Sequence, residues 1–198
     1  MTIDMGGSGL KVLIVDHDEW RANQLEHAFM SQDYQVVARV DSAFKLAAAV
    51  ALHTPDVIII GADSPDRDTL EHLCVATRDC PRPVVMFTGD KNSSSIRAAL
   101  KAGVSAYIVD GLDPARIQPI LEVARIRFEE HQALLNLLNE ASQNLHNRSI
   151  IDQAKQRLMD TQGLTEEVAY HAMRRTSMAE NRRLVEVAQD VLRAFSSN

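Results

Sequence analysis

The chain is poor in the residues and segments on which several classes of protein depend. It has only two cysteines, Cys74 and Cys80, and no neighbouring histidine or cysteine completes a zinc site around them. No apolar run reaches the roughly eighteen residues of a membrane span, and the first residues lack the basic and apolar regions of a secretion signal. We therefore expect a cytoplasmic protein with reduced thiols, no membrane contact, and no bound metal or cofactor.

An excess of positive charge is also lacking. The 198 residues are 45% apolar and carry a formal net charge of −6, which is typical of a globular domain with an appended module. The first 125 residues hold 12 basic and 17 acidic side chains, a balance that disfavours nucleic acid as their partner. Residues 148–193 hold eight basic and seven acidic side chains, so a nucleic-acid surface there must rest on a local cluster.

Short β-branched runs alternate with helical patterns through the first half of the chain. This alternation is typical of a parallel sheet with helices on both faces. We predict an α/β fold with a doubly wound, five-stranded parallel sheet. The expected strands are Lys11–Val15, Gln35–Val40, Val57–Ile60, Val84–Thr88 and Ala106–Val109, and the expected helices are Trp20–Met30, Ser42–Leu52, Thr69–Thr77 and Ser95–Ala102.

Polar residues follow four of these strands. Because the carboxyl ends of parallel strands meet at one edge of a sheet, that edge is where such folds place their working site. The residues expected there are Asp16, His17 and Asp18 after the first strand, Gly61–Asp63 after the third, Thr88 after the fourth and Asp110 after the fifth.

Residues 10–125 resemble the receiver domain of two-component response regulators, which has a flavodoxin-like fold. The motifs P-D-V-I-I-I, M-F-T-G-D and A-G-V-S-A-Y-I-V-D-G stand in that family's order and spacing. The resemblance implies a phosphorylation site: an acidic pair that holds a metal, an aspartate that accepts phosphate, a hydroxyl, and a lysine that neutralises phosphate charge.

Several positions of this sequence depart from the receiver pattern. Asp16 matches the first acid, but His17 stands where the second acid is expected. Thr88 matches the hydroxyl position and Tyr107 the aromatic position beside it. Gly61 replaces the phosphate acceptor, and Asp110 replaces the lysine. We predict a degenerate receiver that has lost the phosphorylation switch.

Two further interpretations of these acids stay open. Asp63 has the same side-chain parity as Gly61 on an extended strand, which makes it a candidate for a displaced phosphate acceptor. In V-L-I-V-D-H-D-E-W, Asp16 and Asp18 also have the spacing of nucleophile and general acid in haloacid-dehalogenase-type phosphatases. Trp20 stands where a small residue is usual, and no later acidic pair supplies the magnesium. We therefore expect no enzymatic activity.

A seam of largely apolar residues, in alternating steps of four and three, follows the receiver-like part. It predicts one long helix over residues 117–147 that pairs with a second copy as a coiled coil, so a homodimer is expected. The alternative is a receiver helix that continues into a linker. The seam comprises Ile117, Leu121, Ala124, Phe128, His131, Leu135, Leu138, Ser142 and Leu145, of which His131 and Ser142 weaken it.

Residues 148–196 contain three short apolar stripes at helical spacing, which predict a small three-helix domain. Gly163 suits the left-handed end of the first helix, and Thr165 suits the start of the second. Ser177 and Glu180 have the spacing of a capping box for the third. The stripes are Ile151, Ala154 and Leu158; Val168, Ala169, Ala172 and Met173; and Leu184, Val187, Ala188, Val191, Leu192 and Phe195.

Basic residues gather on the remaining surface of this small domain. Arginine presents a planar fork to phosphates and base edges, and a tyrosine can stack on an unpaired base. Charges on a helical bundle are more often only its solvated face, but the four arginines between Arg174 and Arg183 favour a nucleic-acid surface. The candidate contacts are Lys155, Arg157, Tyr170, Arg174, Arg175, Arg182 and Arg183.

This tail resembles the ANTAR domain of the AmiR and NasT transcription antitermination regulators. The segments that carry the resemblance are I-D-Q-A-K-Q-R-L-M, G-L-T-E-E-V-A-Y, M-R-R and L-V-E-V-A. The resemblance implies that the domain binds paired stem-loops of a leader RNA, which then cannot refold into a terminator hairpin.

Within that family the chain is most similar to the NasT type, through D-S-P-D-R-D-T-L-E-H-L and P-R-P-V-V-M-F-T. This resemblance implies control of nitrate or nitrite assimilation. A NasS-like sensor protein would hold the protein inactive and release it when the ion binds. The alternative for the same architecture is a response regulator whose tail binds DNA.

Overall fold

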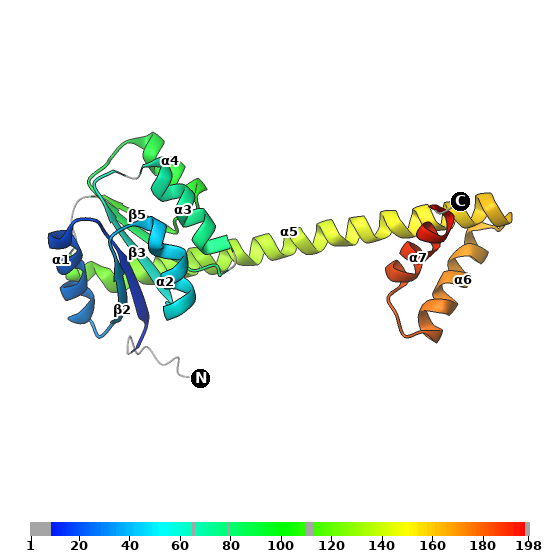
Figure 1. The fold of residues 1–198 in the computed structure, drawn as a ribbon, viewed down its shortest axis with the longest axis horizontal. Coiled ribbons are helices and arrows are strands. Elements are labelled where there is room, and N and C mark those ends of the chain that lie inside the picture. The colour runs from blue at the N-terminus through cyan, green and yellow to red at the C-terminus, as the bar shows by residue number, and fades with distance from the viewer. Residues whose placement is uncertain (1–8, 65, 79, 110–112, 197–198) are drawn as a thin grey trace. The chain divides into compact units, whose positions relative to one another are not determined.

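Five parallel strands form a single sheet in the order β2-β1-β3-β4-β5 (Figure 1). The computed structural model describes residues 9–64, 66–78, 80–109 and 113–196. Each neighbouring pair of strands is parallel, so the predicted doubly wound α/β fold is confirmed. The strands are β1 (Lys11–Val15), β2 (Gln35–Val40), β3 (Val57–Ala62), β4 (Val84–Thr88) and β5 (Ala106–Val109).

Helices cover both faces of the sheet, because the central strands carry apolar side chains on both faces. Every residue of β3 and β4 is buried, as expected for the near-continuous apolar run of a two-sided parallel strand. One core packs the sheet against α1 and α5, and the other packs it against α2, α3 and α4. The helices of this part are α1 (Glu19–Met30), the 3-10 turn η1 (Ala43–Lys45), α2 (Leu46–His53), α3 (Arg67–Arg78), α4 (Ser93–Lys101) and α5 (Pro114–Gln162).

Helix α5 continues without a break through the predicted neck. Near its start, Ile117, Leu121 and Ala124 are buried in the core of the sheet domain. The predicted dimer seam is therefore wrong at these positions, because side chains that pack against the sheet are not open to a second chain. Further along, Leu138 and Leu145 are 58% and 71% exposed, so the later seam positions remain open.

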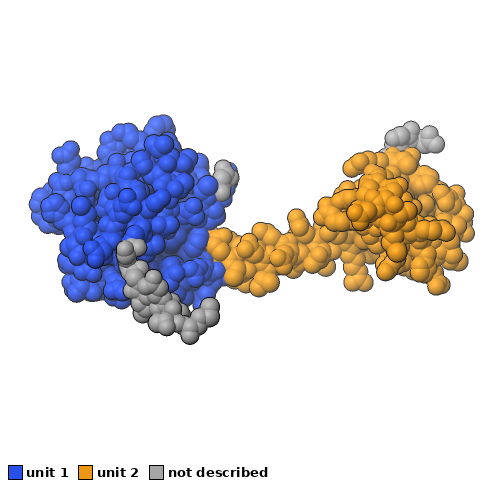
Figure 2. Space-filling model, turned by 90° about the horizontal axis from the view of Figure 1, so that it is seen from below, with its two compact units in different colours: residues 1–131 blue, residues 132–198 orange. Residues whose placement is uncertain are grey.

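The chain falls into two compact units, residues 1–131 and residues 132–198 (Figure 2). Within the second unit, the end of α5 packs against α6 (Glu166–Ala179) and α7 (Leu184–Ser196). Most of the predicted stripe residues meet in this core. Val168 and Ala172 are not part of it, and the Val168 side chain is exposed.

Two of the three predicted helix boundaries in this unit are confirmed. Gly163 has a φ of 66° just after α5, and the Thr165 side chain accepts a hydrogen bond from the Val168 N–H at the start of α6. The third is wrong, because Ser177 lies inside α6 and its hydroxyl donates to the carbonyl of Arg182 at 2.6 Å. Among the described residues, no helix combines the length and apolarity that crossing a membrane requires.

Candidate functional site

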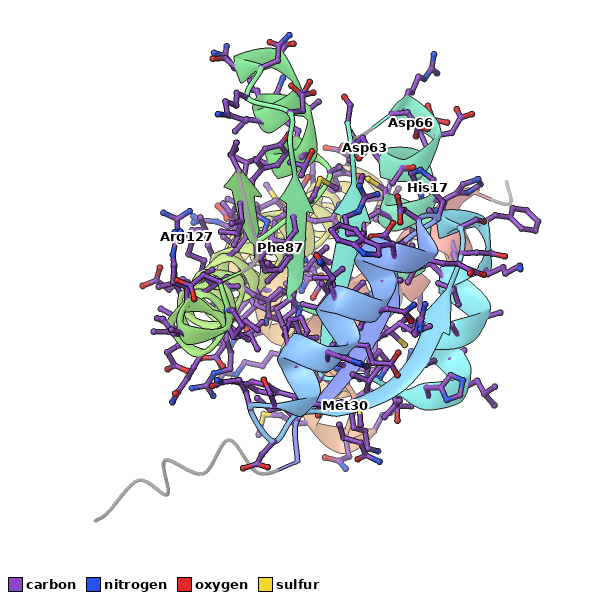
Figure 3. All side chains as sticks on the ribbon, turned by 90° about the vertical axis from the view of Figure 1, so that its left-hand side faces the viewer. His17, Met30, Asp63, Asp66, Phe87 and Arg127 are labelled. Atoms are coloured by element: carbon purple, nitrogen blue, oxygen red, sulfur yellow. The ribbon has the colours of Figure 1, made fainter. Side chains whose placement is uncertain are left out.

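The carboxyl edge of the sheet brings together most of the residues that the sequence placed there. Asp16 and His17 follow β1, Gly61 lies within β3, and Thr88 ends β4. Figure 3 shows His17, Asp63 and Asp66 at this edge, whereas Met30 lies at the opposite end of α1. Asp110 lies outside the described residues.

An arginine that the sequence analysis missed organises this edge. Arg21, in the first turns of α1, donates from Nε to Asp16 Oδ2 at 2.7 Å and from Nη2 to Asp16 Oδ1 at 2.9 Å. Its Nη1 also donates to the Asp63 carboxylate. The Asp16 side chain is fully buried and Arg21 is 22% exposed, so the guanidinium is the partner that makes the buried charge tolerable.

These contacts keep the Arg21 guanidinium protonated. The hydrogen bonds to Asp16, and secondarily those to Asp63, raise the pKa of Arg21 above its already high ordinary value. A bidentate guanidinium–carboxylate pair is among the strongest polar contacts in proteins. Arg21 therefore places a permanent positive charge inside the pocket where a receiver needs a metal and a phosphoryl group.

Gly61 supplies the space for this pair. A Cβ atom built at Gly61 would overlap Asp16 Oδ2, lie 2.7 Å from Asp16 Cγ and lie 3.1 Å from Arg21 Nε. The backbone of Gly61 is not among the positive-φ glycines, so its conformation does not require glycine. Space requires it. A signal for this arrangement was present in the sequence, since an acid is lost at position 61 and a cation stands five residues after Asp16.

The residues of this edge do not fit the divalent metal that the receiver resemblance implies. Both oxygens of Asp16 are occupied by Arg21, and Asp16 Oδ1 also accepts the Asp18 N–H at 2.9 Å. The second acid is replaced by His17, whose side chain is exposed. No cluster of three or more potential ligands occurs in the part of the chain that the structure describes. Within the described part of this edge, the Asp16 oxygens that a magnesium ion would need are therefore already taken up by hydrogen bonds.

Thr88 and Tyr107 hold the loops around this edge. The Thr88 hydroxyl donates to the Asp63 carbonyl at 2.9 Å and accepts from the Asp90 N–H at 3.1 Å. The Tyr107 hydroxyl donates to the Asp90 carbonyl at 3.0 Å, and burial raises the pKa of Tyr107. Both hydroxyls are thus committed to the backbone of neighbouring loops.

Asp18 serves as the N-cap of α1. Its carboxylate accepts the Arg21 N–H at 3.0 Å, and this hydrogen bond lowers the pKa of Asp18. A general acid must be protonated at its working pH, which a lowered pKa opposes. Asp16, the nucleophile of the phosphatase interpretation, is covered by Arg21. The geometry therefore disfavours catalysis by this pair.

Ion pairs divide the basic residues of the second unit into two groups. Lys155, whose side chain is only 16% exposed, contacts Asp152 and Glu166, both at 2.7 Å, and so links α5 to the start of α6. Arg182 contacts Glu180 at 2.9 Å and Asp190 at 2.6 Å and so links the α6–α7 turn to α7. These cations, together with Arg183 beside Glu186, are partly neutralised within the fold.

The other group is exposed and unpaired. Arg157, Arg174 and Arg175 have no ion-pair partner among the described residues, and each is exposed. Arg174 and Arg175 border a shallow depression of about 560 Å³ on α6, together with the exposed Val168 and Met178. Tyr170 is partly exposed on the same helix, with its ring centroid 6.0 Å from that of His171. Among the described residues, helix α6 therefore presents two exposed arginines without an ion-pair partner, and Arg148 and Arg157 on α5 present two more.

Comparison with known families assigns both parts of the chain. The response regulator receiver domain matches residues 12–122, and the ANTAR domain matches residues 139–192. The transcriptional regulatory protein PdtaR of Mycobacterium tuberculosis is 25% identical over 187 residues, which cover 94% of this chain and 91% of that protein. A nitrate regulatory protein of Klebsiella oxytoca is 37% identical over 73 residues, which cover 37% of this chain and 18% of that protein.

Solved structures agree on the fold of the first unit. The CheY-like response regulator receiver domain of Methanospirillum hungatei superposes with a TM-score of 0.53 at 23% identity, over 62% of this chain and 99% of that chain. At this level of identity the likeness concerns the fold alone.

Proposed function

Because the chain belongs to the response regulator receiver family and carries an ANTAR domain as well, we propose that it is an RNA-binding transcription antiterminator. In this proposal the helical unit binds stem-loops of a leader RNA, and RNA held in that form cannot refold into a terminator hairpin. The observation that carries the proposal is the pair of exposed, unpaired arginines on α6, inside the segment that matches the ANTAR domain.

The RNA contacts proposed first are Arg174 and Arg175, with Arg157 on α5 as a third. An arginine that already satisfies two carboxylates would have to exchange them for phosphate, which reduces the gain in free energy on binding. Lys155 and Arg182 are therefore assigned chiefly to joining the helices of this unit. Arg183 pairs with Glu186, three residues further along the chain, and this contact does not join two helices. Tyr170 is partly exposed and can stack on an unpaired loop base beside Arg174.

We propose that the receiver unit acts without phosphorylation. The space for an acceptor side chain is taken by the Asp16–Arg21 pair, and Arg21 already supplies a positive charge in the pocket. The signal must then arrive by contact with another protein. The likeness to a nitrate regulatory protein supports a NasS-like nitrate or nitrite sensor as that partner, which would hold the protein inactive in the cytoplasm and release it when the ion binds.

Two copies of the chain are proposed to pair through the middle of α5. The apolar side chains that remain open there are Leu134, Leu135, Leu137, Leu138 and Leu145. Phe128, Leu135, Leu138 and Leu145 keep the alternating spacing of a coiled-coil seam. A dimer carries two RNA-binding units, and tethering raises the effective concentration of the second unit once the first has bound.

A competition experiment tests the RNA assignment. Binding of the full chain to a labelled RNA with two tandem hairpins is measured by fluorescence anisotropy. The competitors are the same RNA unlabelled, a scrambled RNA and a DNA duplex of equal length. The proposal expects that only the hairpin RNA competes efficiently. Preferential competition by duplex DNA would replace it with a DNA-binding response regulator.

A further inference from the structure

A groove of about 770 Å³ lies between α3 and α4, which stand side by side on one face of the sheet (Figure 1). Its walls are mostly apolar or small. Leu70, Cys74 and Val75 contribute from α3, Ala98 contributes from α4, and Ala102 contributes from the C-cap of α4. Val75 is 55% exposed, so its apolar side chain is open to a partner.

Positive charge gathers at one end of this groove. Arg78 and Lys101 stand in the last turns of α3 and α4 and line the groove. Both helices return antiparallel to the strands, so their carboxyl ends lie at the same end of the domain. Neither cation has an ion-pair partner within the described ranges of the chain. At the other end, Arg67 is neutralised by Glu71 at 2.6 Å.

This charge distribution contrasts with the rest of the unit. The first 125 residues carry 17 acidic and 12 basic side chains, so two cations at one end of a groove contrast with the acidic balance of this part of the chain. Cations near helix carboxyl ends do favour the helix dipole. That effect accounts for their position along each helix, but it does not account for the open apolar surface of Val75 beside them.

We propose that the groove between α3 and α4 binds an amphipathic helix of a partner protein, with acidic residues in the first turn of that helix set against Arg78 and Lys101. The apolar stripe of the bound helix covers Val75 and Leu70. The proposal rests on residues 67–102 alone and does not depend on RNA binding.

Shape and helix polarity favour this occupant. Ala98 and Ala102 leave room for a backbone to approach closely, and α3, with 12 residues, is about 18 Å long, enough to support about three turns of a bound helix. A bound helix that begins near Arg78 and Lys101 runs antiparallel to α3 and α4. Its positive amino end then lies beside the negative carboxyl ends of both helices, and acidic residues are favourable in its first turn.

A designed peptide can serve as the probe. It is a stapled helix of about fifteen residues with leucines on one face and glutamates in the first turn. The comparison peptide has the same composition, with the glutamates moved to the last turn. Binding to the full-length protein is followed by anisotropy. Occupancy of the groove is followed by the alkylation rate of Cys74, and Cys80, which is also a free exposed thiol but does not line the groove, serves as the internal reference.

The proposal expects that the first peptide slows alkylation of Cys74 at least about fivefold and leaves Cys80 unchanged. Charge reversal with Arg78→Glu and Lys101→Glu should weaken binding about tenfold. Arg97→Glu, on α4 but outside the groove, should leave binding unchanged. Equal binding of the two peptides, equal effects of Arg97→Glu and the double reversal, or unaltered Cys74 reactivity at saturation would each overturn the proposal. Circular dichroism confirms that each variant is folded.

Discussion

The Asp16 carboxylate lies in the space that a side chain at Gly61 would occupy. Asp16 follows β1 and Gly61 lies near the end of the neighbouring β3, at the same edge of the sheet. Arg21 fixes the carboxylate there with two hydrogen bonds. The loss of an acceptor at position 61 and the gain of an internal cation are therefore parts of one arrangement. A receiver built in this way keeps its surface and its fold while its pocket is filled by its own side chains.

The first prediction concerns Gly61. Gly61→Ala should lower the free energy of unfolding by about 1–3 kcal/mol, because the added methyl group forces the buried Asp16–Arg21 pair to move. Urea unfolding measures this change. Gly89→Ala is the matched control, since a Cβ there meets no atom within 4 Å and should change stability by less than about 1 kcal/mol. Equal effects of the two substitutions would contradict the packing argument.

The second prediction concerns Arg21. Arg21→Gln should cost roughly 3 kcal/mol of stability, because it leaves the fully buried Asp16 carboxylate without its counter-charge. The double variant Asp16→Asn with Arg21→Gln should be more stable than Arg21→Gln alone, since no charge then remains buried. Arg39→Gln, which breaks the more exposed contact with Glu26, should cost less than about 1 kcal/mol. A double variant no better than the single one would refute the charge argument.

The third prediction separates RNA contacts from structural cations. Arg174→Ala or Arg175→Ala should weaken binding to hairpin RNA and reduce the slope of log K against log salt by about one unit each, with the fold intact. Lys155→Ala should instead lower the melting temperature, because it removes the link between Asp152 and Glu166. Salt titrations and thermal melts of the same variants make the comparison. If Lys155→Ala instead reduced the salt slope and the two arginine variants lowered the melting temperature, the RNA surface would lie on α5 rather than on α6.

The fourth prediction concerns the dimer. Leu138→Glu places a charge in the open part of the seam and should convert the dimer to a monomer in sedimentation equilibrium. Val123→Glu is the control, because Val123 is also exposed on α5 but stands outside the seam spacing. Dissociation by both variants, or by neither, would argue against pairing through this seam.

Much of the fold could be predicted from the sequence, because buried β-branched runs such as Val57–Ile60 define strands and their alternation with helices defines the sheet. The same reasoning could not tell which apolar residues of α5 pack against the sheet and which remain open to a second chain. Leu121 and Leu138 share the heptad pattern, yet the first packs on the sheet and the second is open. Periodicity reports which side chains share a face, and only the packed structure shows what covers that face.

The candidate sites were harder to predict than the fold for a related reason. Arg21 lies in an ordinary helical segment, and its role depends on the cavity that Gly61 leaves one strand away. In the second unit, Lys155 and Arg175 look alike in sequence. Carboxylates brought in from α6 and from the preceding turn of α5 distinguish them. Charge pairing across elements is therefore the information that local sequence patterns lack.

The most direct test of the central claim is transcription through a terminator whose leader encodes two tandem hairpins. Purified full-length protein is added with and without acetyl phosphate and Mg²⁺, and intact mass is recorded in parallel to detect any phosphoryl group, including one on Asp63. The account predicts that the protein raises readthrough to the same level in both conditions, with no change in its mass. Readthrough that requires acetyl phosphate and is accompanied by phosphoryl addition, or no readthrough in either condition, would contradict it.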